Sequence, residues 1–515
     1  MIFRKKIITY ENLVLILSIS AAIAATIYFY SRDLIIAYGD AESHLNIAKR
    51  VISGLTPGMA QLGGIWLPLP HLLLVPFVAN NFLWRTGLAG SIVSGTAFVL
   101  STFFLYKLTL LLTSSQSTAF WTALIFLTNP NLLYLQSTPL TELFLIAFFI
   151  LNTYFLSKFI LNQDEIVSLI LAAFFGFCST LSRYDGWFLV ALETGLIFLH
   201  SWWQKAKDQR QGRVILFATP AFYGIILWLG WNFLIFGNPL YFNTSVFSAR
   251  AQQLAWKARG ELPAYFNLPV AFIYYLVTVL NNAGIIFFLT AGLGLLFYLF
   301  DQKRSFSRWL IALILLSPFA FNVISLFLGQ SVIFIPSLTP ASFEWRLFNV
   351  RYGVMMMPAV AFWAAYFIKK LGKLKLPFAV SLLILNSAAF GTGFFRVISL
   401  DDGVFGLSAA KKVDAQNWLK QNYDGGLVLL DDYARTLSVI RANIPMNRLI
   451  YIGTKPYWQE SLIFPEKYSR WLVMQKGDEV WNNLYENPEK LARVYKYFNK
   501  VYTSEEILIF KRIDH

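Results

Sequence analysis

Long apolar runs separated by short polar segments repeat along most of this chain. The first run covers residues 13–30 and follows the basic residues Arg4, Lys5 and Lys6. A helix of that length crosses roughly 30 Å of hydrocarbon. Because basic residues stay on the cytoplasmic side, we expect an uncleaved first membrane helix with its N-terminus in the cytoplasm.

Further apolar runs of similar length follow the first. They predict spans at about 86–111, 118–134, 140–161, 166–182, 187–203, 213–235, 282–300, 309–328, 352–368 and 376–395. The pattern therefore predicts a polytopic α-helical membrane protein with about eleven transmembrane helices and an outside C-terminus. The apolar segment 67–84 contains Pro68, Pro70 and Pro76, so we expect it to lie in or dip into the interface. Whether it spans the membrane stays open.

The basic residues test this topology, because they should occupy cytoplasmic loops. They fall in alternate loops, at Lys107, at Lys158, and in groups at residues 205–213, 303–308 and 369–375. The loops between them face outside. Among these, residues 31–85 and 237–281 form long loops, a length typical of lids or binding loops.

The composition changes at about Asp401, where the chain becomes mixed and charged. Helical periodicity at residues 408–422 precedes buried strand patterns at 426–430, 468–474 and 507–510. We therefore expect a transmembrane domain at 1–400 and a small extracytoplasmic α/β domain at 401–515. The latter shows no catalytic signature and suits a lid or an acceptor-docking platform.

The overall composition excludes several classes of protein. With 57% hydrophobic and 14% charged residues, the chain lies outside the range of soluble domains. The net charge of +15 sits in clusters between apolar runs, so we expect no nucleic-acid partner. One cysteine and four histidines make a zinc site of the His/Cys type improbable, and no phosphate-cradling loop is present.

Two carboxylates, Asp40 and Glu42, follow the first span where a membrane helix meets water. Carboxylates there can accept a proton from a substrate hydroxyl, hold a divalent cation, or cap a helix. In the capping alternative, Asp40 is the N-cap of a helix over residues 41–53. His44 lies in the same stretch and is a candidate substrate-binding residue.

Other outside loops bring polar residues to the same side of the membrane. Glu142 begins a span, where either function or the positive end of the helix accounts for a carboxylate. Arg183 and Asp185 form a short turn between spans and could simply pair with each other. All three are candidates for substrate binding.

Two arginines, Arg346 and Arg351, precede a late span. An arginine at the mouth of a span can snorkel to the interface. It can also clamp a phosphate with its planar fork. Because these arginines fall near outside carboxylates, we favour phosphate binding.

The sequence resembles the GT-C glycosyltransferases, most closely the protein O-mannosyltransferase and lipid A aminoarabinose transferase branch. The motifs that carry the likeness are the first-loop acids, Thr138-Pro-Leu-Thr-Glu142, Leu181-Ser-Arg-Tyr-Asp185 and Asn349-Val-Arg-Tyr352. The resemblance implies a GT-C fold, a polyprenyl-phosphate sugar donor, and a catalytic role for Asp40 and, less directly, Glu42. The Asp-x-Glu spacing looks like that of the metal-using oligosaccharyltransferase relatives. This leaves Mg²⁺ or Mn²⁺ open as a cofactor, with Asp40, Glu42 and Glu142 as its candidate ligands.

The implied function is that of a hexosyltransferase in the plasma or inner membrane. It would move a sugar, with inversion, to an acceptor hydroxyl on a glycan, lipid or protein at the extracytoplasmic face. Arg351, together with Arg346, would stabilise the leaving phosphate. The alternative is a transporter or flippase of a lipid-linked sugar. That alternative predicts charges at mid-membrane, whereas the spans are nearly free of charge apart from Glu193.

Overall fold

The structure is a computed structural model that describes the whole chain except residues 1–8, 206, 302–304, 412, 433–436 and 514–515. The contacts divide the chain into two compact units. Unit 1 comprises Met1–Leu34, Gly64–Pro70 and Gly90–Ser408. Unit 2 comprises Ile35–Gly63, His71–Ala89 and Ala409–His515.

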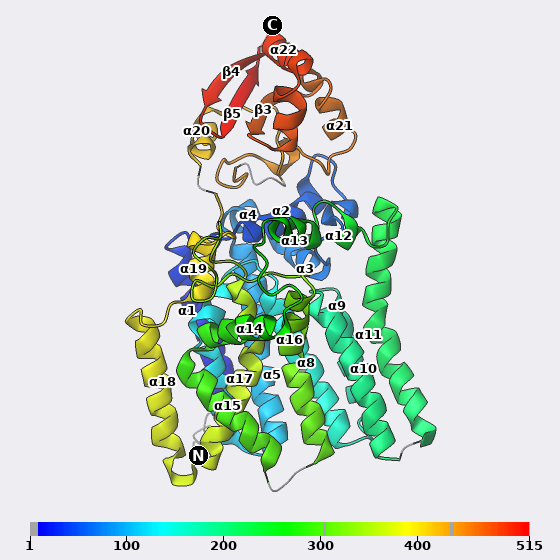
Figure 1. Ribbon diagram of the computed structural model, residues 1–515, viewed down its shortest axis with the longest axis vertical. Coiled ribbons are helices and arrows are strands. Elements are labelled where there is room, and N and C mark those ends of the chain that lie inside the picture. Colours follow the sequence, from blue (N-terminus) through cyan, green and yellow to red (C-terminus); the bar gives the residue numbers. More distant parts are fainter. Residues whose placement is uncertain (1–8, 206, 302–304, 412, 433–436, 514–515) are drawn as a thin grey trace, which may run out of the picture. The chain divides into compact units, whose positions relative to one another are not determined.

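Unit 1 is helical, and its long helices make the chain a membrane protein (Figure 1). In the described part of the chain, seven helical segments are long and apolar enough to cross a membrane. They are α1 (Tyr10–Tyr30), α5 (Leu88–Thr113), α8 (Glu142–Leu161), α11 (Lys207–Phe236), α16 (Phe306–Phe327), η2 (Val350–Met356) joined to α17 (Met357–Lys370), and η3 (Gly372–Leu374) joined to α18 (Lys375–Gly391).

Two of the predicted spans form shorter apolar helices, α6 (Gln116–Leu127) and α9 (Ile166–Thr180). A third forms α10 (Asp185–Trp203), which follows directly from the turn that carries Arg183. The polytopic helical fold is therefore confirmed, while the count of about eleven spans stays a prediction.

Residues 268–283, which the hydrophobic pattern assigned to a long outside loop, form helix α14 (Leu268–Ala283). Asn267 caps this helix by accepting a hydrogen bond from the Val270 amide at 3.2 Å. Gly284, with a φ of +79°, then separates α14 from α15 (Ile285–Phe300), and the two helices meet at 114°. The apolar part of α14 is too short for a full span, and for this reason the sequence pattern did not reveal the helix.

Close helix packing holds the element that carries Arg351. Helices α15 and α17 pack against each other at Gly294, where an added Cβ would lie 1.8 Å from the carbonyl oxygen of Trp363 (Figure 1). Only glycine permits such an approach, as in other membrane helix pairs. Helix α17 continues directly from η2, so this contact fixes the position of η2 within unit 1.

Unit 2 contains a five-stranded sheet with the strand order β2-β1-β3-β5-β4. Its strands are β1 (Leu427–Leu429), β2 (Leu449–Ile450), β3 (Ser469–Gln475), β4 (Phe498–Thr503) and β5 (Ile507–Arg512). The pairs β1–β2 and β1–β3 are parallel, whereas β3–β5 and β4–β5 are antiparallel. The predicted α/β character and the strands now labelled β1, β3 and β5 are confirmed.

Helices flank this sheet and complete its core. The main ones in the C-terminal part are α20 (Asp414–Asn422), α21 (Tyr457–Ser461) and α22 (Pro488–Tyr497). Val494 of α22 is fully buried with Leu472 of β3 and Phe510 of β5. Strands β2 and β4 were not predicted, since β2 has only two residues and β4 is largely exposed.

The acidic stretch forms helix α2 (Gly39–Ser53), which belongs to unit 2 together with most of α3 (Leu69–Val78) and with α4 (Asn81–Thr86). The predicted helix is therefore confirmed, but the capping alternative for Asp40 is wrong. Tyr38 occupies the N-cap position, and Asp40 lies in the first turn. Helix α2 is anchored at its other end, where Arg50 pairs with Asp432 and stacks over the Tyr451 ring at 3.9 Å.

Candidate active site

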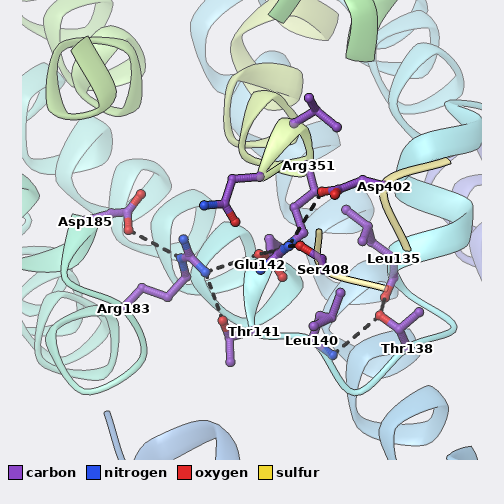
Figure 2. Close-up of polar contacts among 12 residues, drawn as sticks. Leu135, Thr138, Leu140, Thr141, Glu142, Arg183, Asp185, Arg351, Asp402 and Ser408 are labelled. Atoms are coloured by element: carbon purple, nitrogen blue, oxygen red, sulfur yellow. Dashed lines mark hydrogen bonds and ion pairs between the residues drawn. The ribbon is translucent and has the colours of Figure 1, made fainter. Parts of the chain in front are cut away.

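Two arginines from different elements of unit 1 share one carboxylate oxygen (Figure 2). Glu142 begins α8, and its Oε1 accepts a hydrogen bond from Arg351 Nε at 3.0 Å and from Arg183 Nη1 at 3.2 Å. Arg183 comes from the turn between α9 and α10, and Arg351 comes from η2. The structure thus brings together three residues that the sequence marked separately.

Two more carboxylates complete what we call the arginine cluster, defined as Glu142, Arg183, Asp185, Arg351 and Asp402. Two hydroxyls outside this definition also accept hydrogen bonds from its arginines. Arg183 Nε donates to Asp185 Oδ2 at 3.3 Å, and its Nη1 donates to Thr141 Oγ1 at 3.0 Å. Arg351 Nη1 donates to Ser408 Oγ at 3.2 Å and lies 3.7 Å from Asp402 Oδ2. The predicted pairing of Arg183 with Asp185 is therefore one contact of a larger network.

Sequence reasoning missed Asp402, a member of the cluster, and Ser408, whose hydroxyl accepts a hydrogen bond from Arg351. Asp402 lies in α19 (Ile398–Phe405), and both residues belong to unit 1. They follow the point at which the composition becomes charged, so they were counted with the outside domain. An Asp pair at 401–402 directly after an apolar span was the signal that could have marked them.

Burial decides how Arg351 can act. Its exposed fraction is 4% and that of Glu142 is 1%, so this arginine does not reach out to water as a snorkelling side chain does. The ring of Tyr352 adds to its surroundings, because the guanidinium of Arg183 lies 4.9 Å and that of Arg351 lies 5.3 Å from the ring centre. Arg351 is held in place by specific contacts inside the protein.

Within the arginine cluster, three carboxylates face two guanidinium groups. In the part of the chain that the structure describes, Oε2 of Glu142 is buried and has no hydrogen-bond partner. A buried charge without full compensation is unfavourable. Oε2 of Glu142 is therefore held in the protein at a cost in free energy.

Among the described residues, no contact links Arg346 to the arginine cluster. Its guanidinium donates to the carbonyl oxygens of Pro336 at 2.6 Å and of Thr339 at 3.3 Å. These partners belong to the loop that leads from α16 to η2. Arg346 thus stabilises its own loop, and only Arg351 of the two candidate phosphate clamps lies in the cluster.

In unit 2, Glu42 is buried and its Oε1 accepts a hydrogen bond from the Ile440 amide at 3.2 Å. Burial raises the pKa of Glu42 above its ordinary value, although the hydrogen bonds it accepts oppose this shift. Asp40 is only partly buried. Residues two positions apart in an α-helix differ by about 200° around its axis, so the side chains of Asp40 and Glu42 point to different sides of α2.

The residues present do not form a metal site of the kind that the Asp-x-Glu spacing suggested. Among the described residues, no group of three or more His, Cys, Asp or Glu side chains is arranged to hold a metal ion. The different directions of Asp40 and Glu42 are one reason, because a shared ion needs ligands that converge. We therefore derive no step that requires a metal.

His44 contacts a second histidine. Its Nδ1 lies 2.9 Å from Nε2 of His71, and both rings are buried in unit 2. His44 is four residues after Asp40, which places both on one side of α2. The sequence did not predict the contact of His71 with His44, because no spacing rule links a residue of α2 to one of α3.

Comparison with solved structures identifies the fold. The structure of ArnT from Cupriavidus metallidurans bound to undecaprenyl phosphate aligns with 96% of this chain and 97% of its own, at a TM-score of 0.54 and 10% identity. The archaeal oligosaccharyltransferase AglB from Archaeoglobus fulgidus, in complex with an inhibitory peptide and a dolichol-phosphate, aligns with 98% of this chain and 74% of its own, at a TM-score of 0.51 and 12% identity. This chain has a GT-C fold.

The GT-C fold confirms the fold class that the sequence motifs implied. The apo form of the Cupriavidus ArnT gives the same result, at a TM-score of 0.51 and 12% identity over 96% of this chain and 97% of its own. No protein-family model and no curated protein matches the sequence. At such low identity the likeness establishes the fold, and the reaction has to be argued from the residues.

Proposed function

We propose that this protein is an integral membrane glycosyltransferase that moves a sugar from a polyprenyl-phosphate donor to an acceptor hydroxyl. The observation that carries the proposal is the buried contact of Arg351 with Glu142 in a GT-C fold. A guanidinium held in a low-dielectric site is suited to a lipid-linked phosphate. The undecaprenyl phosphate bound to the ArnT neighbour agrees with such a ligand.

The reaction is a single displacement at the anomeric carbon of the donor sugar. Asp40 takes the proton of the acceptor hydroxyl, and the acceptor oxygen forms the new bond to the anomeric carbon. The bond from that carbon to the phosphate oxygen breaks, and polyprenyl phosphate leaves with the electron pair. One in-line step inverts the anomeric configuration.

Arg351 acts on the leaving group. Negative charge grows on the phosphate as the bond breaks, and a preorganised guanidinium stabilises that charge by several kcal/mol. In the structure Arg351 is paired with Glu142 and Asp402, so an arriving phosphate takes over part of this pairing. Arg183, which shares Oε1 of Glu142, keeps that carboxylate in place during the exchange.

Glu42 positions the helix that carries Asp40. Its hydrogen bond from the Ile440 amide, together with the pairing of Arg50 with Asp432, holds α2 against the C-terminal part of unit 2. Asp40 is left on the more open side of the same helix. The raised pKa of Glu42 suits a positioning residue that does not have to stay ionised throughout the reaction.

The orientation and the substrates belong to the same proposal. The N-terminus lies in the cytoplasm and the reaction takes place at the extracytoplasmic face of the plasma or inner membrane, as the alternate basic loops indicate. The sugar is a hexose, and the acceptor is a glycan, a lipid or a protein. The apolar faces of the spans hold the isoprenoid tail.

Transport of a lipid-linked sugar is the competing function. Its support in the sequence is Glu193, an ionisable residue inside a predicted span. This carboxylate is completely buried in α10 and accepts a hydrogen bond from Asn152 of α8 at 3.1 Å. An interhelical hydrogen bond of this kind is a common structural role for a polar side chain between membrane helices. Glu193 thus joins the two helices whose first residues, Glu142 and Asp185, belong to the arginine cluster.

Mass spectrometry of lipids and glycans from cells with and without the protein tests the proposed function. A transferase predicts that a polyprenyl-phosphate sugar accumulates, and that one hexose disappears from an acceptor, when the protein is missing. A flippase moves the lipid-linked sugar across the membrane without breaking its bond to the phosphate, so only a transferase releases polyprenyl phosphate when it is purified and given donor and acceptor. Identical acceptor glycans in the two cells would overturn the proposal.

A further inference from the structure

Helix α14 holds the backbone of η2 on both sides of Arg351. Tyr275 Oη donates to the carbonyl oxygen of Tyr352 at 3.2 Å, and Asn282 Nδ2 donates to that of Val350 at 2.7 Å. These two carbonyls belong to the residues directly after and directly before Arg351. Two side chains of one helix therefore fix the backbone that carries this guanidinium.

A shared face of α14 makes the double contact possible. Tyr275 and Asn282 are seven positions apart, which is about two helical turns, so their side chains lie on the same side of the helix. Both are completely buried. Thr278 lies between them, and its carbonyl oxygen would be 2.5 Å from a Cβ added at Gly353 of η2. Only glycine lets η2 approach the backbone of α14 so closely.

The geometry of η2 makes this support necessary. The segment keeps a 3₁₀ conformation over seven residues, Val350–Met356. Such runs rarely exceed about four residues, because their hydrogen-bond geometry is poorer than that of an α-helix. Contacts from outside the segment therefore decide where the side chain of Arg351 begins.

The end of α14 also holds the helix that carries Asp402. The carbonyl oxygen of Asn282 lies in the last turn of α14, where backbone carbonyls have no partner within the helix. It accepts hydrogen bonds from Asn129 Nδ2 at 2.8 Å and from Asn131 Nδ2 at 3.1 Å. Asn131, in α7 (Pro130–Leu135), accepts through Oδ1 from the Ser399 amide of α19 at 3.0 Å. One helix end thus joins both elements that bring charge to the arginine cluster.

We propose that Tyr275 and Asn282 are positioning residues that hold the guanidinium of Arg351 where it binds the phosphate of the donor. They act through the carbonyls on either side of it. Position matters here, because a misplacement of about 1 Å in an active site can cost on the order of a hundredfold in rate. This role rests on the proposed function, which gives Arg351 a phosphate to bind.

Binding of undecaprenyl phosphate to the full chain in lipid nanodiscs tests the role of Tyr275. Tyr275→Phe removes one hydroxyl and keeps the buried ring, so the affinity should fall about fivefold, the usual effect of one hydrogen bond. Tyr274→Phe is the matched control, because Tyr274 Oη donates at 3.1 Å to the carbonyl oxygen of Leu338, which lies outside η2. This control should bind undecaprenyl phosphate as the wild type does.

A second pair of variants tests the contact before Arg351. Asn282→Leu should lower the affinity for undecaprenyl phosphate at least fivefold. Asn322→Leu should leave it unchanged, because Asn322 Nδ2 donates to the carbonyl oxygen of Pro318 in its own helix, α16, at 2.8 Å.

Thermal unfolding separates positioning from stability. Tyr275→Phe and Tyr274→Phe each lose one buried hydroxyl, so their unfolding midpoints should fall alike. Only Tyr275→Phe should also lose affinity for undecaprenyl phosphate. Equal affinities in the two tyrosine variants would overturn the positioning role.

Coupling with Arg351 is the last readout. In an Arg351→Ala background, Tyr275→Phe should no longer change the affinity, because no guanidinium is left to position. An undiminished effect in that background would contradict the proposal. If Arg351→Ala itself binds undecaprenyl phosphate as tightly as the wild type, the phosphate role of Arg351 is refuted, and the positioning role falls with it. A loss of affinity in Arg351→Ala without one in Tyr275→Phe or in Asn282→Leu refutes the positioning role alone.

Discussion

Arg351 donates through Nε to Oε1 of Glu142 at 3.0 Å, although the two residues are 209 positions apart in the chain. The contact joins the first residue of α8 to the 3₁₀ segment that leads into α17. Arg183 donates to the same oxygen, so the Glu142 carboxylate bridges two guanidinium groups. In the proposed reaction, the donor phosphate competes with Glu142 for Arg351.

The variant Glu142→Gln tests this relationship. It leaves two buried arginines with one carboxylate fewer, and loss of one partner from a buried pair costs about 3 kcal/mol or more. We expect a lower thermal unfolding midpoint in detergent. Added polyprenyl phosphate should raise that midpoint more in the variant than in the wild type, because the Glu142 carboxylate no longer competes with the phosphate for Arg351.

The control for this variant is Glu165→Gln. Glu165 pairs with Lys158 at 3.2 Å, and the two side chains are partly exposed, at 37% and 31%. A surface pair of this kind contributes little to stability, so the control should hardly change the midpoint. Equal effects of polyprenyl phosphate on Glu142→Gln and on the control would argue against phosphate binding at Arg351.

The variant Arg351→Lys separates phosphate recognition from simple charge. Lysine keeps the charge but offers no planar fork, so turnover should fall well beyond any change in expression. The transfer step should suffer more than donor affinity, because the contact strengthens as the phosphate gains charge. Arg346→Lys is the matched control with little expected effect, since Arg346 contacts backbone carbonyls of its own loop.

The acid sensitivity of unit 2 follows from Asp424. Hydrogen bonds from Arg470 and Lys511 hold the pKa of Asp424 well below its ordinary value of 3.8. A carboxyl with a lowered pKa in the folded state adds stability that is present above pH 3.8 and is lost as the pH falls below it. We expect the unfolding midpoint of the wild type to drop more steeply than that of Asp424→Asn between pH 5 and pH 3. Parallel curves would contradict this role.

The orientation predicts the result of proteolysis on intact spheroplasts. If the N-terminus is cytoplasmic, protease added outside should remove the C-terminal domain while the helices stay protected. A tag at the N-terminus should survive the same treatment and serves as the internal control. Full protection of the C-terminal domain would overturn the topology, and the site on that face with it.

Much of this fold could be predicted, because long apolar runs and basic loops report directly on membrane helices. Glu142, Arg183, Asp185 and Arg351 could be singled out for a related reason, since each stands at the end of an apolar run. The convergence of Arg183 and Arg351 on Oε1 of Glu142 depends on how the elements that carry them pack, and no local pattern encodes such packing. The division of the chain at residue 401 remains a prediction about its domains.

Three features could not be predicted from the sequence, and each has a physical reason. Asp402 lies in a charged segment in which a buried carboxylate does not stand out, and α14 is too short to read as a span. The burial of Glu42 results from the amide of Ile440, almost 400 residues away in the sequence. Contacts over such separations come from tertiary structure alone.

The most direct test of the proposed reaction is the release of polyprenyl phosphate by the purified protein in nanodiscs. With a polyprenyl-phosphate hexose and an extract of acceptors, the wild type should release one polyprenyl phosphate for each hexose transferred. Asp40→Asn should release almost none, because it keeps the size of the side chain but removes the base. Glu42→Gln should retain more activity than Asp40→Asn, as expected of a positioning residue. Release by Asp40→Asn at the wild-type rate would contradict the assignment of Asp40 as the base, and transfer without release of polyprenyl phosphate would contradict the proposed reaction.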